Sequence, residues 1–289
     1  MSVAGLRARA GAMVFERVAG AEGRARRERI HGTPGPRWFA EERPIRRVHG
    51  DASMFVGGLR ALLLQSLHPL AMAGVAGHSG FRGDPWGRLA RTSYFLAVTT
   101  FGAASDAEAT VARIRSVHDR VRGVAPDGRA YAATDPHLLR WVHVAEIDSF
   151  LRAYQRYGAA PLDTAGRDGY VRDAARVARA VGVLDPPQSE AELDAQLAAF
   201  RPELQGTQEA RSTARFLLLH PPLPLAARVP YALLAAAAVG LLPRWARRPL
   251  ALPDWPRADA TVVPLAGHGV TRAIRWAMSP PAPRGEHGG

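Results

Sequence analysis

The sequence predicts an all-α protein folded as a single large helical bundle. Patterns typical of helix starts and ends recur along the chain, whereas alternating β-branched runs and Asn-Gly hairpin turns are scarce. A length of 289 residues, 47% of them hydrophobic, is enough for one large buried core. We therefore expect a basic N-terminal arm over 1–48, a helical domain over 49–252 and a C-terminal extension over 253–289, whose Pro/Gly-rich tail from Ser279 is disordered.

The first expected helices follow the N-terminal arm. The arm itself is basic and weakly periodic, which indicates some helix and then an extended piece around Thr33–Pro36. Apolar runs predict helices near 53–67 and 86–101. Asp84, followed by a proline, is a typical start for the second of these, because proline suits the first helical position.

Capping patterns define the later helices. A capping box at Ser105–Glu108 predicts a helix towards Val121, closed by Gly123 and the Pro-Asp-Gly turn that follows. Asp135 before a proline predicts a long helix that ends at Tyr157, ahead of a glycine. Further helices are expected at 163–182, 207–219 and 229–242. A second capping box, at Ser189–Glu192, predicts the start of another helix.

Composition excludes several classes of site. The formal net charge is +12, and every basic side chain is an arginine. These arginines are scattered among acids, with no known nucleic-acid motif and no stacking pattern of aromatic and basic residues, so we expect no nucleic-acid partner. Without cysteine the chain has no disulfides, iron–sulfur clusters or thiolate-held metals, so any metal is held by His, Asp, Glu, Tyr or Met.

Three stretches bear on localisation. Residues 1–19 lack the continuous apolar core of a secretory signal, so we expect a cytoplasmic protein. The apolar stretch 54–76 is broken by polar residues and a proline, and 229–242 is shorter than the roughly 20 residues that span a bilayer, so both are expected to be buried helices. The alternative for 229–248 is a peripheral membrane contact, with lipid phosphates bound by Arg244, Arg247 and Arg248.

The first candidate site lies between His68 and Thr92. If a helix begins after Asp84, Arg88 and Thr92 stand at i and i+4 and point from one face. A guanidinium and a hydroxyl one turn apart can hold an anion, a carboxylate or an activated oxygen. The purely structural alternative is an arginine paired with Asp84 or another acid.

Two histidines on apolar helix faces form the other candidates. His118 shares its side of the helix with Ile114, and there it could simply cap the C-terminus. His143 lies mid-helix beside Ile147, where a neutral imidazole can ligate iron, although a lone core histidine is more often only a packed residue. Glu146 follows His143 at i+3, like half of a di-iron site in reversed order, but no second half is found.

The order of these motifs resembles a known family. Residues His68 to Thr92 read H-P-x4-G-x3-H-S-x-F-x2-D-P-x2-R-x2-R-T, in which the second histidine is His78 and is followed by Ser79 and Phe81. The later motifs are His118, Tyr131-Ala132-Ala133, Asp135-Pro136 and Trp141-Val142-His143. Together they resemble the MpaB and latex-clearing-protein (rubber oxygenase) family over roughly Gly50 to Leu252.

The resemblance implies an all-helical oxidoreductase that carries haem b and uses dioxygen on a small apolar substrate, unsaturated or isoprenoid in kind. It assigns the iron ligand to His143 and the catalytic distal arginine and threonine to Arg88 and Thr92. Arg91 stands where rubber oxygenases have a lysine, a change that keeps the charge and alters its geometry. The haem-binding residues that it implies are His78, Arg88, Arg91, Thr92, His118 and His143.

The sequence departs from the family in one respect. Rubber oxygenases use a distal glutamate upstream of the arginine as a base, and here no glutamate lies between Glu42 and Arg88. Either another residue takes that role or the reaction differs. His118 and His68 remain rival iron ligands. A non-catalytic haem carrier or sensor, and a cofactor-free helical protein at the membrane surface, are the alternative functions.

Overall fold

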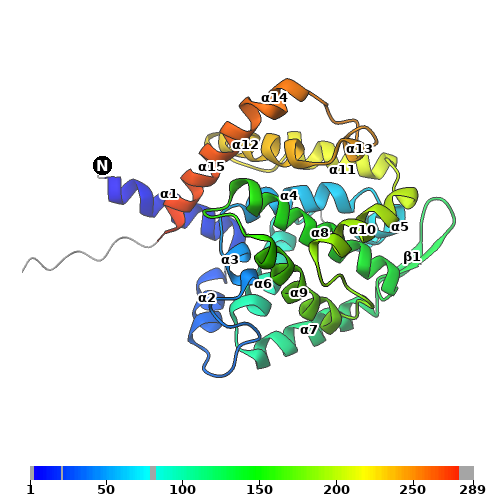
Figure 1. Ribbon diagram of the computed structural model, residues 1–289, viewed down its shortest axis with the longest axis horizontal. Coiled ribbons are helices and arrows are strands. Elements are labelled where there is room, and N and C mark those ends of the chain that lie inside the picture. Colours follow the sequence, from blue (N-terminus) through cyan, green and yellow to red (C-terminus); the bar gives the residue numbers. More distant parts are fainter. Residues whose placement is uncertain (1–2, 21, 79–82, 280–289) are drawn as a thin grey trace, which may run out of the picture.

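The computed structural model describes residues 3–20, 22–78 and 83–279, and this part of the chain confirms the all-α prediction (Figure 1). The first half contains α1 (Val3–Ala19), α2 (Gly23–Gly32), α3 (Pro44–His49), α4 (Met54–Gln65), α5 (Pro69–His78), α6 (Pro85–Phe101), α7 (Ala104–His118) and α8 (Pro136–Tyr157). The second half contains α9 (Thr164–Val181), α10 (Glu190–Phe200), the 3-10 turn η1 (Arg201–Glu203), α11 (Gln208–Leu219), α12 (Leu225–Leu241), α13 (Arg244–Arg247), α14 (Pro256–Ala260) and α15 (Val262–Met278). Within the described residues the only sheet is the antiparallel pair β1 (Arg122–Val124) and β2 (Ala130–Ala132).

Helix α8 forms the centre of the bundle, with α4 packed along it (Figure 1). Trp141 and Leu151 of α8 are fully buried. Gly57 of α4 allows the two helices to approach closely, because a Cβ there would lie 2.8 Å from the ring of Phe150. This close packing holds α8, the helix that contains His143, against α4.

Most of residues 253–279 are helical, in α14 and α15, and pack on the rest of the described chain. Helix α12 lies on α4, and α15 lies on α12 and α1. Arg275 of α15 donates hydrogen bonds at 2.9 Å to both carboxylate oxygens of Asp51, which ties the end of the chain to the start of the core. Of the tail expected to be disordered, only Ser279 is among the described residues.

Most helix starts expected from caps are confirmed. Asp135 accepts a hydrogen bond from the backbone nitrogen of His137, and α8 ends at Tyr157. The hydroxyl of Ser189 accepts a hydrogen bond from the backbone nitrogen of Glu192. The Glu192 carboxylate accepts one from the backbone nitrogen of Gln188, whereas a complete capping box would have it accept from that of Ser189. Helix α12 begins before the expected residue 229, at Leu225, so Pro230 lies inside it.

The expected start and end of α7 are wrong. Its N-cap is Ala103, without a side-chain cap, so Ser105 does not cap the helix; Asp106, in the first turn, accepts a hydrogen bond of 2.7 Å from Arg29. The helix ends at His118, and the Pro-Asp-Gly turn belongs to the β1–β2 hairpin, where Gly128 has a φ of +86°. That conformation suits glycine, and it closes a hairpin that the weak strand signal did not predict.

Two findings concern the apolar stretches. Among the described residues no single helix is both long and apolar enough to cross a membrane; α4 and α5 reach that length only together, across a bend of 107°. Arg247, expected to bind lipid phosphate, is only 4% exposed, pairs with Asp259, and donates to the carbonyl oxygens of Gly240 and Leu242. Its partners are within the fold, so that part of the membrane expectation is wrong.

Candidate functional site

Three of the predicted site residues each carry a buried polar atom without a hydrogen-bond partner: Nη1 of Arg88, Nδ1 of His118 and Nε2 of His143. Leaving such an atom unpaired costs about 1–3 kcal/mol, and buried polar groups in native proteins nearly always have a partner. Atoms of this kind therefore indicate where a ligand could supply the missing contact.

His143 lies in the middle of α8 and is 9% exposed. Burial lowers the pKa of its imidazole to about 3, so the ring is neutral throughout the physiological range. The neutral form is the one that binds a metal, and Nε2 is the nitrogen left without a partner. His143 thus meets the chemical requirement for an axial ligand.

Glu146 stands one turn further along α8. It is half-buried, and the loss of water around its carboxyl raises its pKa to about 7. Its charge acts on the phenol of Tyr170, whose hydroxyl lies 3.3 Å from Nε2 of the half-buried His49. The one feature of the sequence that made Glu146 a candidate was its position three residues after His143.

His118 is the last residue of α7 and is half-buried. It continues the inward side of the helix formed by Ala107 and Val111, both of which are buried. Burial lowers the pKa of its imidazole, with a smaller opposing effect from Asp119. The neutral ring and its unpaired Nδ1 keep His118 a rival to His143.

Helix α6 begins as the sequence predicts. Asp84 caps it by accepting a hydrogen bond of 2.8 Å from the nitrogen of Gly87. Arg88 is half-buried, and its pKa is lowered, first by burial and then by the charge of Arg91. Arg91 is exposed and pairs with Asp84 at 3.5 Å. Thr92 is also exposed, so the two expected catalytic residues differ in their burial.

His78 ends α5 and is exposed. Its Nδ1 lies 3.4 Å from the hydroxyl of Tyr131 on β2, so the hairpin packs against this end of α5. Ser79 and Phe81, the next residues of the family motif, lie outside the described residues.

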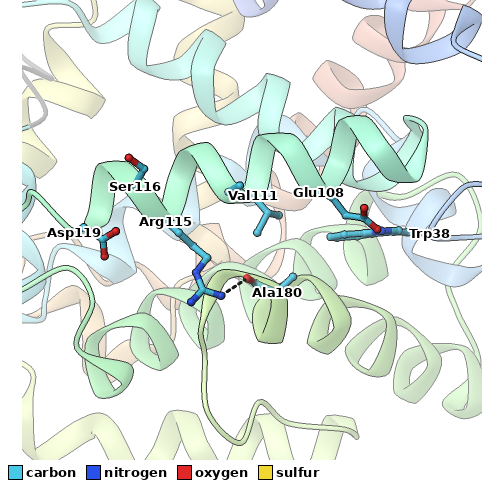
Figure 2. A pocket seen from close by; sticks show the side chains of 8 residues that line it. Trp38, Glu108, Val111, Arg115, Ser116, Asp119 and Ala180 are labelled. Carbon is cyan, nitrogen blue, oxygen red and sulfur yellow. Dashed lines mark hydrogen bonds between the residues drawn. The ribbon is translucent and has the colours of Figure 1, made fainter.

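His68 belongs to a different cluster. It is buried at the bend between α4 and α5, where its neighbours are His137 of α8 and Glu203 of η1. Neither neighbour belongs to a local motif, so no sequence pattern indicated either of them. A separate surface hollow along α7 and α9 is lined by Trp38, Glu108, Val111 and Arg115, and contains none of the predicted site residues (Figure 2).

Comparison with protein families gives one match. Residues 46–276 of the chain match the catalytic domain described as ER-bound oxygenase mpaB/B'/rubber oxygenase. Neither the curated proteins nor the solved structures contain a significant match. The matched region contains every predicted site residue, including the unpaired atoms of Arg88, His118 and His143. Because the match spans most of its length, the chain belongs to the mpaB and rubber oxygenase family.

Proposed function

We propose that this protein is a haem b-dependent oxygenase that uses dioxygen to oxidise or cleave a small apolar substrate, unsaturated or isoprenoid in kind. Membership of an oxygenase family supports the reaction class. The observation that carries the haem assignment is the set of unpaired buried atoms on His143, His118 and Arg88. An imidazole is a common axial ligand of haem iron, and a hydrogen-bond donor beside the iron helps decide how oxygen is bound; these residues offer both.

The proposed roles follow from charge and burial. Nε2 of His143 would hold the iron, and bound haem would supply the activation of dioxygen. The half-buried guanidinium of Arg88 carries an unpaired donor that can bind an anionic oxygen. Thr92, one turn away, adds a hydroxyl. His78, Arg91 and His118 complete the proposed binding residues.

Glu146 does not replace the missing distal glutamate, because it lies on the same helix as the proposed iron ligand; we propose instead that it exchanges a proton beside His143. With a pKa of about 7, its carboxyl exists in both protonation states near neutral pH. A general base works best when its pKa is near the working pH, since it must both take and release a proton. Glu146 would hold that proton on a carboxylate oxygen, one helical turn from His143.

Glu146→Gln should make the protein more stable at high pH. The folded-state pKa of about 7 exceeds the ordinary value of 4.5, so the folded protein keeps a proton that the unfolded chain loses within this window. The contribution of this carboxyl to the free energy of unfolding therefore falls as pH rises from 4.5 to 7. The neutral glutamine avoids this loss, so the free energy of unfolding should rise by up to about 3 kcal/mol at pH 8 and much less at pH 5.

Denaturant unfolding of both proteins at the two pH values measures this difference. Glu209→Gln on α11 is the matched control, because it removes a carboxylate elsewhere in the fold. An equal stability change at both pH values in Glu146→Gln would contradict the raised pKa.

A visible absorption spectrum of the purified protein tests the function, before and after dithionite. A Soret band that sharpens on reduction, with a pyridine haemochrome of haem b, is the expected result. A colourless protein that fails to take up added haem would remove the proposal. Six-coordinate iron without oxygen-dependent turnover would instead favour the carrier or sensor function.

A peripheral membrane contact is a second proposal, carried by α12. Leu225, Val229 and Leu233 form an exposed stripe at spacings of four residues, with 77%, 70% and 38% of their surfaces exposed. Arg228 and Arg248 are also exposed and suit an anionic lipid surface. The opposite side of α12 is buried against α4, so the stripe faces away from the core.

The protein should therefore float with anionic vesicles, and Leu225→Glu with Val229→Glu should weaken this binding at least tenfold. Burying one such side chain contributes about 1.5–3 kcal/mol, and a tenfold change corresponds to about 1.4 kcal/mol. Leu184→Glu, at another exposed apolar position, is the control. Equal flotation of the double variant and the control would contradict the proposal.

A further inference from the structure

Three potential metal ligands that are far apart in the sequence meet at one end of the bundle. They are His68 at the bend between α4 and α5, His137 in the first turn of α8, and Glu203 in η1. One ligand atom from each lies within 4.8 Å of the others. No other group of three or more such side chains is found in the described residues.

The spacing of these atoms fits a first-row divalent cation. Nε2 of His137 lies 2.8 Å from Oε2 of Glu203, and Nε2 of His68 lies 3.4 Å from the same oxygen. Bonds of about 2.0–2.2 Å from a metal to nitrogen and oxygen place neighbouring ligand atoms roughly 3–3.6 Å apart. Small side-chain movements would therefore bring all three onto one ion.

His68 gives an independent reason to expect a ligand. Its side chain is only 2% exposed, and neither ring nitrogen has a partner with hydrogen-bond geometry. His137 and Glu203 hydrogen-bond to each other and so need no metal to account for their positions. The two ring nitrogens of His68, however, remain without a hydrogen-bond partner. A cation bound to Nε2 would satisfy the buried imidazole.

The surroundings resemble those of an open metal site. Trp141 and Phe200 flank the His68 ring at centroid distances of 6.1 Å and 6.5 Å, which provides an apolar wall. The side chains of His137 and Glu203 are 42% and 40% exposed, so an ion has access from solvent. Three protein ligands with one open side are typical of zinc sites that keep a water ligand.

Two arginines oppose this binding in part. Arg140 approaches Nδ1 of His137 at 3.4 Å, and it must turn away when a metal occupies Nε2, because Nδ1 then carries the proton. The positive charge of Arg129 also acts on His68 and Glu203. Both effects weaken the site, so the ion is expected to exchange with solvent.

We propose that His68, His137 and Glu203 form a second site, separate from the haem residues, which binds one zinc ion or a similar divalent cation and joins the α4–α5 bend to α8 and η1. The site does not depend on the proposed oxygenase function. It uses none of the residues assigned to haem.

Equilibrium dialysis of the full-length protein without a histidine tag tests the proposal, in the form in which it is purified, with or without bound haem. Zinc is measured by elemental analysis, so haem iron does not interfere. About one equivalent of zinc is expected to bind, and saturating zinc should raise the melting temperature by roughly 5 °C. Glu203→Gln and His137→Gln should each lower the zinc affinity at least tenfold, because each removes one of three ligands.

The controls replace the same residue types outside the cluster. Glu209→Gln and His220→Gln, both at α11, should retain zinc binding. His68→Gln should also lose the ion; if that buried change prevents folding, the two half-exposed variants still decide the question. Wild-type protein without bound zinc, or equal binding in Glu203→Gln and Glu209→Gln, would overturn the proposal.

Discussion

His143→Ala should abolish haem retention while the bundle stays folded. The change removes the proposed axial nitrogen, and alanine is compatible with the middle of α8. We expect haem occupancy at a fixed haem concentration to fall at least tenfold, which corresponds to a loss of at least about 1.4 kcal/mol in binding. Loss of one buried side chain costs about 1–3 kcal/mol of stability, less than the total for a typical domain.

The measurement is the ratio of Soret to protein absorbance, with far-ultraviolet circular dichroism to confirm the helical fold. His118→Ala is the decisive comparison, because His118 carries the other unpaired imidazole nitrogen among the residues to which we assign haem binding. Haem retained in His143→Ala but lost in His118→Ala would move the axial ligand to α7. Haem retained in both single variants and in the double variant would contradict the assignment of His143 or His118 as the iron ligand.

The helix boundaries that the sequence predicted well are those with local chemistry. The Asp135 cap and the Ser189 cap each involve a side chain and a backbone nitrogen two or three residues away, so the sequence contains both partners. Asp106 shows the limit of such reasoning. It lies inside the expected box of Ser105 and Glu108, but the helix begins earlier, after Ala103, and Asp106 pairs with Arg29, 77 residues away, which no local pattern predicts.

Local patterns also single out individual residues of the candidate site, although their function stays a prediction. Histidines and an arginine among apolar helix positions single out His143, His118 and Arg88, and the structure leaves each with an unpaired buried atom. The raised pKa of Glu146 depends on the burial of its carboxyl by the tertiary fold, and no local sequence pattern reveals that burial. The pairing of His137 with Glu203 joins residues 66 positions apart, so it required the structure.

Removing the carboxylate of Asp148 should give the largest loss of stability among the variants considered. Asp148 and Arg60 are 2% and 3% exposed and form an ion pair at 2.7 Å between α8 and α4. Arg60 also donates to Ser149 Oγ at 2.6 Å and to the Leu241 carbonyl oxygen at 3.0 Å, so it cannot leave the core easily. Asp148→Ala would leave a buried guanidinium without its counter-charge.

The expected cost is about 3–5 kcal/mol, because an uncompensated buried charge is much more costly than a lost surface pair. Thermal unfolding should then show a melting temperature lower by roughly 6–20 °C. Asp194→Ala is the matched control: Asp194 pairs with Arg152 but is 55% exposed, so its loss should cost less than about 1 kcal/mol.

The double variant Arg60→Met with Asp148→Leu separates charge from packing. It removes both charges and keeps apolar volume, so it should be more stable than Asp148→Ala, and by more than the size of the leucine side chain explains. If the double variant is instead the least stable, the hydrogen bonds of Arg60 to Ser149 and Leu241 contribute more than the ion pair does. A melting temperature of Asp148→Ala equal to that of Asp194→Ala would mean that water reaches the Arg60 guanidinium, contrary to its burial between α4 and α8.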